Sequence, residues 1–128
     1  NIPSGIRVIL VNTIGHLSYL YRFGTLAYIG GGFGKGIHNI LEAATYGQPV
    51  IFGPEYRNFV EAKELVSLGG AYPVEDAGQL LSTIHQQLED RDLLKTSSDT
   101  AANYVSERLG ATLIILEDLC KKSGLIML

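Results

Sequence analysis

The feature that most constrains the fold is a glycine-rich segment between a short apolar stretch and a helix-forming one. Residues 26–29 predict a buried strand, residues 30–36 read Gly-Gly-Gly-Phe-Gly-Lys-Gly, and residues 37–46 predict a helix. Glycine adopts positive φ angles and lets the backbone approach a ligand closely. The start of a helix offers free N–H groups and a partial positive charge, which suit a phosphate. The segment therefore predicts a nucleotide site at a strand-to-helix turn.

Strands and helices alternate along the rest of the chain. Alternation with short connections is typical of a Rossmann-like α/β fold, a parallel sheet with helices on both faces. The loops that follow parallel strands meet at one sheet edge, where such folds bind ligands. We therefore expect residues 12–16, 30–36 and 53–58 to converge. The other predicted strands are 7–11, 49–52 and 71–74, and the other predicted helices are 14–22, 59–68, 77–88 and 90–119 with a break near Gly110.

Composition narrows the class of protein. A chain of 128 residues with 46% hydrophobic and 18% charged residues is expected to fold as one globular domain. A net charge of -3 without a stripe of Lys and Arg argues against a nucleic-acid partner. Three histidines without a carboxylate cluster argue against a metal site. The chain starts at Asn1 rather than Met, and four strands make half of a typical two-lobed nucleotide-sugar enzyme. We therefore expect it to be one lobe of a longer protein.

Two polar residues favour a ligand-binding interpretation of the glycine-rich turn over a purely structural one. Asn39 and Glu42 are three residues apart, so in a helix they share one face. Glu42 stands among apolar neighbours and needs a polar partner, and ribose hydroxyls are suitable donors. The turn matches neither the phosphate-binding Gly-Lys-Ser/Thr pattern nor the dinucleotide fingerprint. His38 can simply line the turn, and among the tyrosines only Tyr56 falls in a loop of the expected site.

A series of motifs resembles one family. The chain contains, in order, NTIGHL from Asn12, GGGF from Gly30, GIHNILEAA from Gly36, PVIFGP from Pro49 and NF from Asn58. This series resembles the carboxy-terminal domain of the 3-deoxy-D-manno-octulosonic acid (Kdo) transferases of Gram-negative bacteria. The resemblance is close over residues 8–71, and the later helices match in layout more than in motif.

The resemblance implies a GT-B glycosyltransferase of which this chain is the second, donor-binding lobe. Such enzymes transfer Kdo from CMP-Kdo to the lipid A precursor, with inversion at the sugar and without a metal or another cofactor. The general base is a glutamate of the amino-terminal lobe, so the chain alone is expected to be inactive. The implied location of the parent protein is the cytoplasmic face of the bacterial inner membrane, with the membrane attachment on its amino-terminal side.

The resemblance also implies a nucleotide site. Glu42 would hold the ribose, Asn39 and the helix start would face the phosphate, and the glycines would allow close approach. The family's first loop usually carries acids where this chain has Asn12 and His16, so no carboxylate role is expected at position 16. The implied nucleotide-binding residues are Ile14, Gly15, His16, Gly31, Gly32, His38, Asn39, Ile40, Leu41 and Glu42.

Two other classes share parts of this pattern. Another GT-B enzyme or a nucleotide-sugar epimerase would have the same fold and a ribose-binding glutamate, but it would prefer a UDP- or GDP-sugar. A non-catalytic interaction module would keep the layered fold and show no preference among nucleotides.

Overall fold

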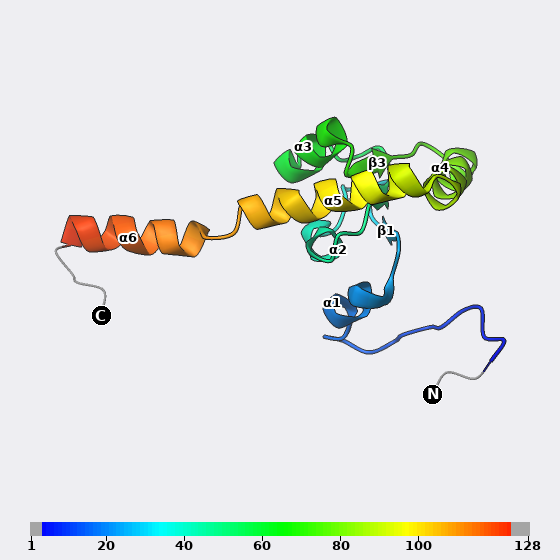
Figure 1. Cartoon of the computed structure of the whole chain (residues 1–128), viewed down its shortest axis with the longest axis horizontal. Coiled ribbons are helices and arrows are strands. Elements are labelled where there is room, and N and C mark those ends of the chain that lie inside the picture. Colours follow the sequence, from blue (N-terminus) through cyan, green and yellow to red (C-terminus); the bar gives the residue numbers. More distant parts are fainter. Residues whose placement is uncertain (1–3, 124–128) are drawn as a thin grey trace.

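A computed structural model describes residues 4–123, and in the last helix the side chains of residues 114, 115 and 118–122. Its centre is a three-stranded parallel sheet in the order β1-β2-β3 (Figure 1). The strands are β1 (Ala27–Ile29), β2 (Val50–Phe52) and β3 (Ala71–Pro73). Three of the four predicted strands, and the parallel α/β class, are therefore confirmed.

The helices begin and end largely where the sequence contains capping residues. The Asp76 side chain accepts a hydrogen bond from the amide of Gln79 at 2.8 Å and starts the helix after β3. Asp90 caps the following helix in the same way, at the predicted boundary between the helices at 77–88 and 90–119. Gly110, with a φ of +108°, lies at the predicted break. The helices after β1 are α2 (Leu41–Thr45), α3 (Val60–Leu68), α4 (Ala77–Glu89), α5 (Arg91–Glu107) and α6 (Ala111–Ser123).

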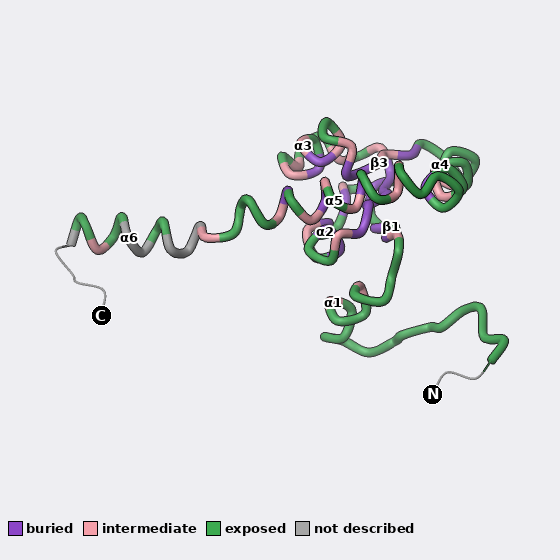
Figure 2. Tube along the Cα trace, in the orientation of Figure 1, coloured by how far each residue is buried: buried purple, intermediate pink, exposed green. Residues whose placement is uncertain are grey.

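The core lies around β2 and between α2 and α5. All three residues of β2 are buried (Figure 2). Because successive side chains of a strand point to opposite faces of the sheet, both faces of β2 are covered. Helices α2 and α5 pack against each other through small side chains, which let the two helices approach closely. These side chains, all fully buried, are Ala43 and Ala44 of α2 and Ala101 of α5. Residues 27–108, which contain this core, are called the body below.

A polar cluster also joins α3 to α5 within the body. The Tyr104 hydroxyl donates a hydrogen bond to Glu64 Oε2 at 2.6 Å. Arg108 donates to the same oxygen at 3.0 Å and lies over the Tyr104 ring at 3.7 Å. Burial and the bond to Glu64 raise the pKa of Tyr104 to about 12, and the Tyr104 hydroxyl lowers the pKa of Glu64.

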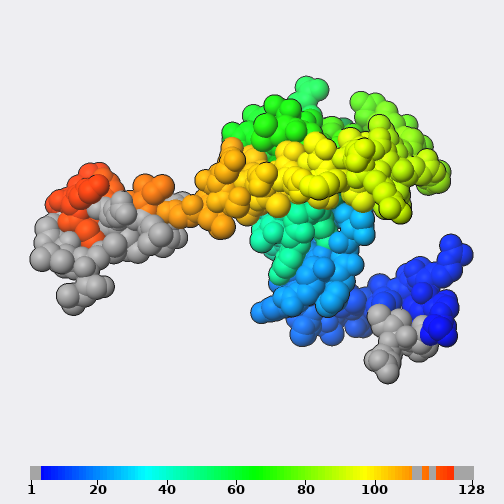
Figure 3. Space-filling view, in the orientation of Figure 1, coloured from blue at the N-terminus to red at the C-terminus, as the bar shows by residue number. Residues whose placement is uncertain are grey.

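Residues 4–26, called the arm below, differ from the sequence-based prediction. The strand predicted at residues 7–11 is wrong, because this segment forms no strand and its side chains are exposed (Figure 2). The predicted helix at 14–22 is shorter, with α1 (Leu17–Leu20) followed by the 3-10 helix η1 (Tyr21–Phe23). A strand needs a neighbour to bond its backbone. β1 bonds β2 only, and the arm runs away from the sheet (Figures 1 and 3).

The helix predicted at residues 37–46 begins later than expected. The amide of His38 donates to the carbonyl of Gly30 at 3.1 Å, which holds the chain beside the end of β1. Ile37 and Ile40 belong to this non-helical segment, and both are buried in the core. The chain therefore becomes helical only at Leu41, and His38 and Asn39 precede α2 rather than belonging to it.

None of the helices within residues 4–123 combines the length and the apolar character that crossing a bilayer requires.

Candidate functional site

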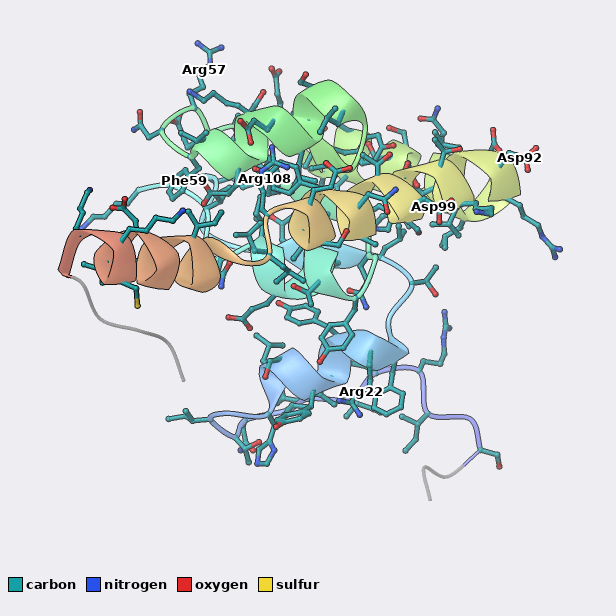
Figure 4. The ribbon with its side chains drawn as sticks, turned by 60° about the vertical axis from the view of Figure 1, so that its left-hand side comes forward. Arg22, Arg57, Phe59, Asp92, Asp99 and Arg108 are labelled. Carbon is teal, nitrogen blue, oxygen red and sulfur yellow. The ribbon has the colours of Figure 1, made fainter. Side chains whose placement is uncertain are left out.

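The glycine-rich loop after β1 and the loop after β2 meet at the carboxyl edge of the sheet, as predicted. The amide of Glu55 donates to the carbonyl of Gly32 at 2.9 Å. A Cβ on Gly32 would lie 2.6 Å from the backbone nitrogen of Gly53, so this contact requires glycine. In the loop after β2, the Arg57 side chain points away from the body (Figure 4).

The third predicted loop does not join them. Residues 12–16 are exposed, and the Ile14 side chain is fully so. The His16 carbonyl accepts hydrogen bonds from the amides of Tyr19 and Leu20 at the start of α1. Ile14, Gly15 and His16 line neither of the two cavities described below. Their assignment to a nucleotide site stays a prediction, and this structure does not bring them to the other residues.

A cavity of about 670 Å³ lies between the arm and the body, and we call it the arm–body cavity. His38, Asn39 and Glu42 line it together, which brings three of the predicted residues to one place. The opposite wall is apolar and comes from the arm. The residues that line the cavity are Leu17, Leu20, Tyr21, Gly24, Leu26, Ala27, Tyr28, Ile29, Gly30, His38, Asn39, Glu42 and Gln48.

A smaller hollow of about 420 Å³ adjoins this cavity through His38 and is formed by the glycine-rich loop. Gly31, which lines it, has a φ of +94°, and a Cβ there would lie 2.4 Å from the carbonyl oxygen of Gly36 and 3.1 Å from the His38 ring. Lys35 and His38 are its ionisable side chains. The loop therefore presents bare backbone and a cation next to the arm–body cavity.

Asn39 and Glu42 are joined to each other, which the sequence spacing alone did not indicate. Asn39 Nδ2 donates to Glu42 Oε1 at 3.0 Å, and Asn39 Oδ1 accepts from the amide of Leu41 at 3.0 Å. Glu42 is exposed rather than enclosed by its apolar neighbours. The sequence predicts that Glu42 needs a polar partner, and in this structure that partner is Asn39.

Two further predicted residues contribute differently. Ile40 is 1% exposed and packs in the core, so only its backbone is available to a ligand. Leu41 is half-buried against the same core. Tyr56, considered as a possible site residue, packs with its ring 5.3 Å from that of Phe52.

Several residues of the cavity were missed by the sequence analysis. Gln48 is buried, and its side chain donates to the carbonyl of Tyr21, which attaches η1 to the body. Burial and the nearby negative charge of Glu42 raise the pKa of Tyr21. Arg22, labelled in Figure 4, does not line the cavity itself, and its Cζ atom lies 5.4 Å from the ring centroid of Tyr19 and 6.0 Å from that of Tyr46. No local motif marks these residues, because their role depends on how the arm meets α2.

The described part of the chain contains no group of three or more His, Cys, Asp or Glu side chains arranged to hold a metal ion. What the cavity offers is a carboxylate acceptor, a histidine and an apolar wall, with a lysine in the adjoining hollow. These groups can bind a ligand that has hydroxyl donors at one end and negative charge at the other.

Comparison with known proteins finds several 3-deoxy-D-manno-octulosonic acid transferases and a bifunctional glycosyltransferase/methyltransferase from Fusobacterium nucleatum. The chain is 32% identical over 109 residues to the 3-deoxy-D-manno-octulosonic acid transferase of Bordetella pertussis, covering 84% of this chain and 26% of that protein. It is 36% identical over 90 residues to the enzyme of the same name from Aquifex aeolicus, covering 69% of this chain and 26% of that protein. The chain thus spans about a quarter of the length of these curated relatives. No protein-family model matches it.

A solved structure has the same fold. The C-terminal CMP-Kdo binding domain of WaaA from Acinetobacter baumannii superposes with a TM-score of 0.68 at 23% sequence identity, covering 74% of this chain and 51% of that chain. The parallel sheet and its helices therefore have the same fold as that domain.

Proposed function

We propose that this chain, a homologue of the Kdo transferases, is a donor-binding domain that holds CMP-Kdo in the arm–body cavity. The observation that carries this is the meeting of Glu42, Asn39 and His38 in one cavity beside a glycine-rich loop. The names of the curated relatives and of the similar solved domain support the identity of the donor.

The charges of the site support one orientation of the nucleotide. Glu42 accepts hydrogen bonds and repels anions, so the ribose hydroxyls belong beside it. The lining of the arm–body cavity contains no lysine or arginine, whereas Lys35 lines the adjoining hollow. The phosphate therefore belongs on the far side of His38, against the backbone of Gly31 and the Lys35 ammonium group.

The proposed reaction of the parent protein is transfer of Kdo to the lipid A precursor, with inversion and without a metal. Fixed N–H donors and a cation beside the departing CMP phosphate stabilise its charge without reorganisation. The acceptor hydroxyl must lose a proton to a general base. We assign that base, the acceptor site and the attachment to the inner membrane to the other lobe. The chain alone is then expected to bind nucleotide and to transfer nothing; Kdo transfer by the isolated chain would contradict this.

The test is an amide-resolved NMR titration with CMP, UMP and GMP in parallel. We expect shifts at Gly31, Lys35 and residues 37–42 that are largest with CMP and are lost in Glu42→Ala. Glu107→Ala, an exposed glutamate of α5 that lines no part of the cavity, is the matched control and should behave as the wild type. Equal shifts with all three nucleotides would favour a UDP- or GDP-sugar enzyme, and no shifts with any would favour a non-catalytic module.

A further inference from the structure

We propose that Asn39 is a positioning residue that fixes the carboxylate of Glu42 in its binding orientation before a nucleotide arrives. This inference rests on the proposed function, because it assumes that Glu42 receives the ribose. It also changes the role expected for Asn39. Both groups of its amide are already bonded within the chain, Nδ2 to Glu42 Oε1 and Oδ1 to the amide of Leu41, so one of its two N–H donors is committed to Glu42 rather than to a phosphate.

The two bonds of Asn39 act together. The bond from the Leu41 amide to Oδ1 fixes the Asn39 side chain against the start of α2. Nδ2 is thereby aimed at Glu42 Oε1, 3.0 Å away. Among the described residues, no other side chain donates a hydrogen bond to Glu42. The orientation of the Glu42 carboxylate therefore depends on the side-chain amide of Asn39 alone.

The restraint matters because Glu42 is exposed. A free glutamate side chain samples several rotamers, and a ligand must select one of them when it binds. With Oε1 held by Asn39, Oε2 remains available to accept a hydroxyl of the ligand in a fixed direction. Preorganisation of this kind lowers the entropic cost of binding without any contact between Asn39 and the ligand.

Two ionisable side chains face Glu42 across the cavity. Tyr21 approaches from η1, and the charge of Glu42 contributes to its raised pKa. His38 lines the same cavity from the segment before α2. Tyr28 of β1 is the third ionisable side chain in the lining of the cavity, and the remaining lining residues have none. The Asn39 amide can therefore be altered without disturbing an ion pair of Glu42.

The test uses two substitutions of Asn39 whose effects should differ in their dependence on pH. Asn39→Asp keeps an oxygen for the Leu41 amide but replaces the donor with a second carboxylate beside Glu42. Asn39→Ser keeps a short acceptor and removes the donor without adding charge. Asn103→Asp, at an exposed position of α5 that lines neither the arm–body cavity nor the adjoining hollow, is the matched control for added charge. Each variant is titrated with CMP, and its Kd is divided by that of the wild type at the same pH, so that titration of CMP itself cancels.

We expect both Asn39 variants to bind CMP more weakly at pH 7.5, by about tenfold, the fold-change that one hydrogen bond to a charged group supports. At about pH 5.5 the Kd ratio of Asn39→Asp should fall back toward one, because two adjacent carboxylates share a proton that replaces the amide donor. The ratio of Asn39→Ser should stay unchanged with pH. Recovery of Asn39→Asp also shows that this variant is folded.

A second measurement needs no ligand and separates this inference from the proposed function. In the free protein, Glu42→Ala should shift the side-chain amide resonances of Asn39, whereas Glu107→Ala should not. If the wild type does not bind CMP, the proposed function fails and the resonances still decide whether Asn39 holds Glu42. Unshifted resonances, or Kd ratios of one for both Asn39 variants at pH 7.5, would overturn the positioning role.

Discussion

The body and the arm are both rich in apolar residues, yet they bury them to very different extents. Phe52 in β2 is fully buried, whereas Phe23 at the end of η1 is 81% exposed. The body contains paired strands and helices that cover them, and the arm has no strand partner. The arm is attached through specific contacts instead, namely the Gln48 bond to the Tyr21 carbonyl and the approach of the Arg22 guanidinium group to within 6.0 Å of the Tyr46 ring centroid. Apolar sequence therefore becomes core only where a partner surface exists.

The strongest test of this comparison removes the same ring from each region. Phe52→Ala should lower the free energy of unfolding by about 3–5 kcal/mol, because it leaves a cavity in the core. Phe23→Ala should change the free energy of unfolding by less than about 0.5 kcal/mol, as an exposed substitution does. Urea denaturation of both variants measures the difference. Similar losses in the two variants would mean that the arm is packed as tightly as the body.

A second test concerns the backbone contact between the two loops of the body. Gly32→Ala should lower the free energy of unfolding by about 1–3 kcal/mol, because the new Cβ would lie 2.6 Å from the nitrogen of Gly53. Gly34→Ala is the matched control within the same loop. Its Cβ would meet only the Gly31 carbonyl oxygen at 3.9 Å, and its φ lies outside the positive range. Thermal unfolding that ranks these two variants in the reverse order would contradict the contact.

The same contrast explains what could be predicted from sequence. Strands β1, β2 and β3 are visible because each is a short apolar segment followed by glycine or a helix cap, and their partners lie within the chain. The segment at residues 7–11 has the same local character, but it does not pair with the outer edge of β1, which no local pattern can reveal. In the site, the spacing of Asn39 and Glu42 indicates that they are neighbours, but not that they bond each other. Tyr21 and Gln48 depend on the docking of the arm, which is a tertiary event.

The third test removes one hydroxyl from the cluster that joins α3 and α5. Tyr104→Phe loses the hydrogen bond to Glu64 and should lower the free energy of unfolding by about 1 kcal/mol near pH 7. Tyr28→Phe, an exposed tyrosine of β1, is the matched control and should have little effect. Chemical denaturation at pH 7 compares the two.

The pH dependence of the Tyr104→Phe effect follows from the two shifted groups. Glu64 has a lowered pKa in the folded state, so its contribution is present above its usual value of 4.5 and is lost as the pH falls below it. Tyr104 has a raised pKa, so its contribution is present below its usual value of 10.0 and is lost as the pH rises toward about 12. The difference between wild type and variant should therefore be largest between these limits, and a difference that grows below pH 4 would contradict the assignment.

The smallest expected effect lies in the arm. Val8→Thr replaces a methyl group by a hydroxyl on a side chain that is 83% exposed, and it should change the free energy of unfolding by less than about 0.5 kcal/mol. The same substitution at the fully buried Val50 should cost about 1–3 kcal/mol, because the hydroxyl loses water. A cost at Val8 that equals the cost at Val50 in urea denaturation would show that residues 7–11 are covered.

The close approach of Gly32 and Gly53 has a mechanical consequence. The two loops are also joined by the bond from the Glu55 amide to the Gly32 carbonyl, and a Cβ on Gly36 would strike the Phe59 ring at 2.8 Å. With no side chain between them to compress, one loop cannot be displaced without pushing the other. A ligand that displaced the glycine-rich loop would therefore also displace the loop after β2. Through Gly36 it would move the ring of Phe59, the residue that precedes α3. The glycine-rich loop and the amino-terminal end of α3 are therefore expected to move together.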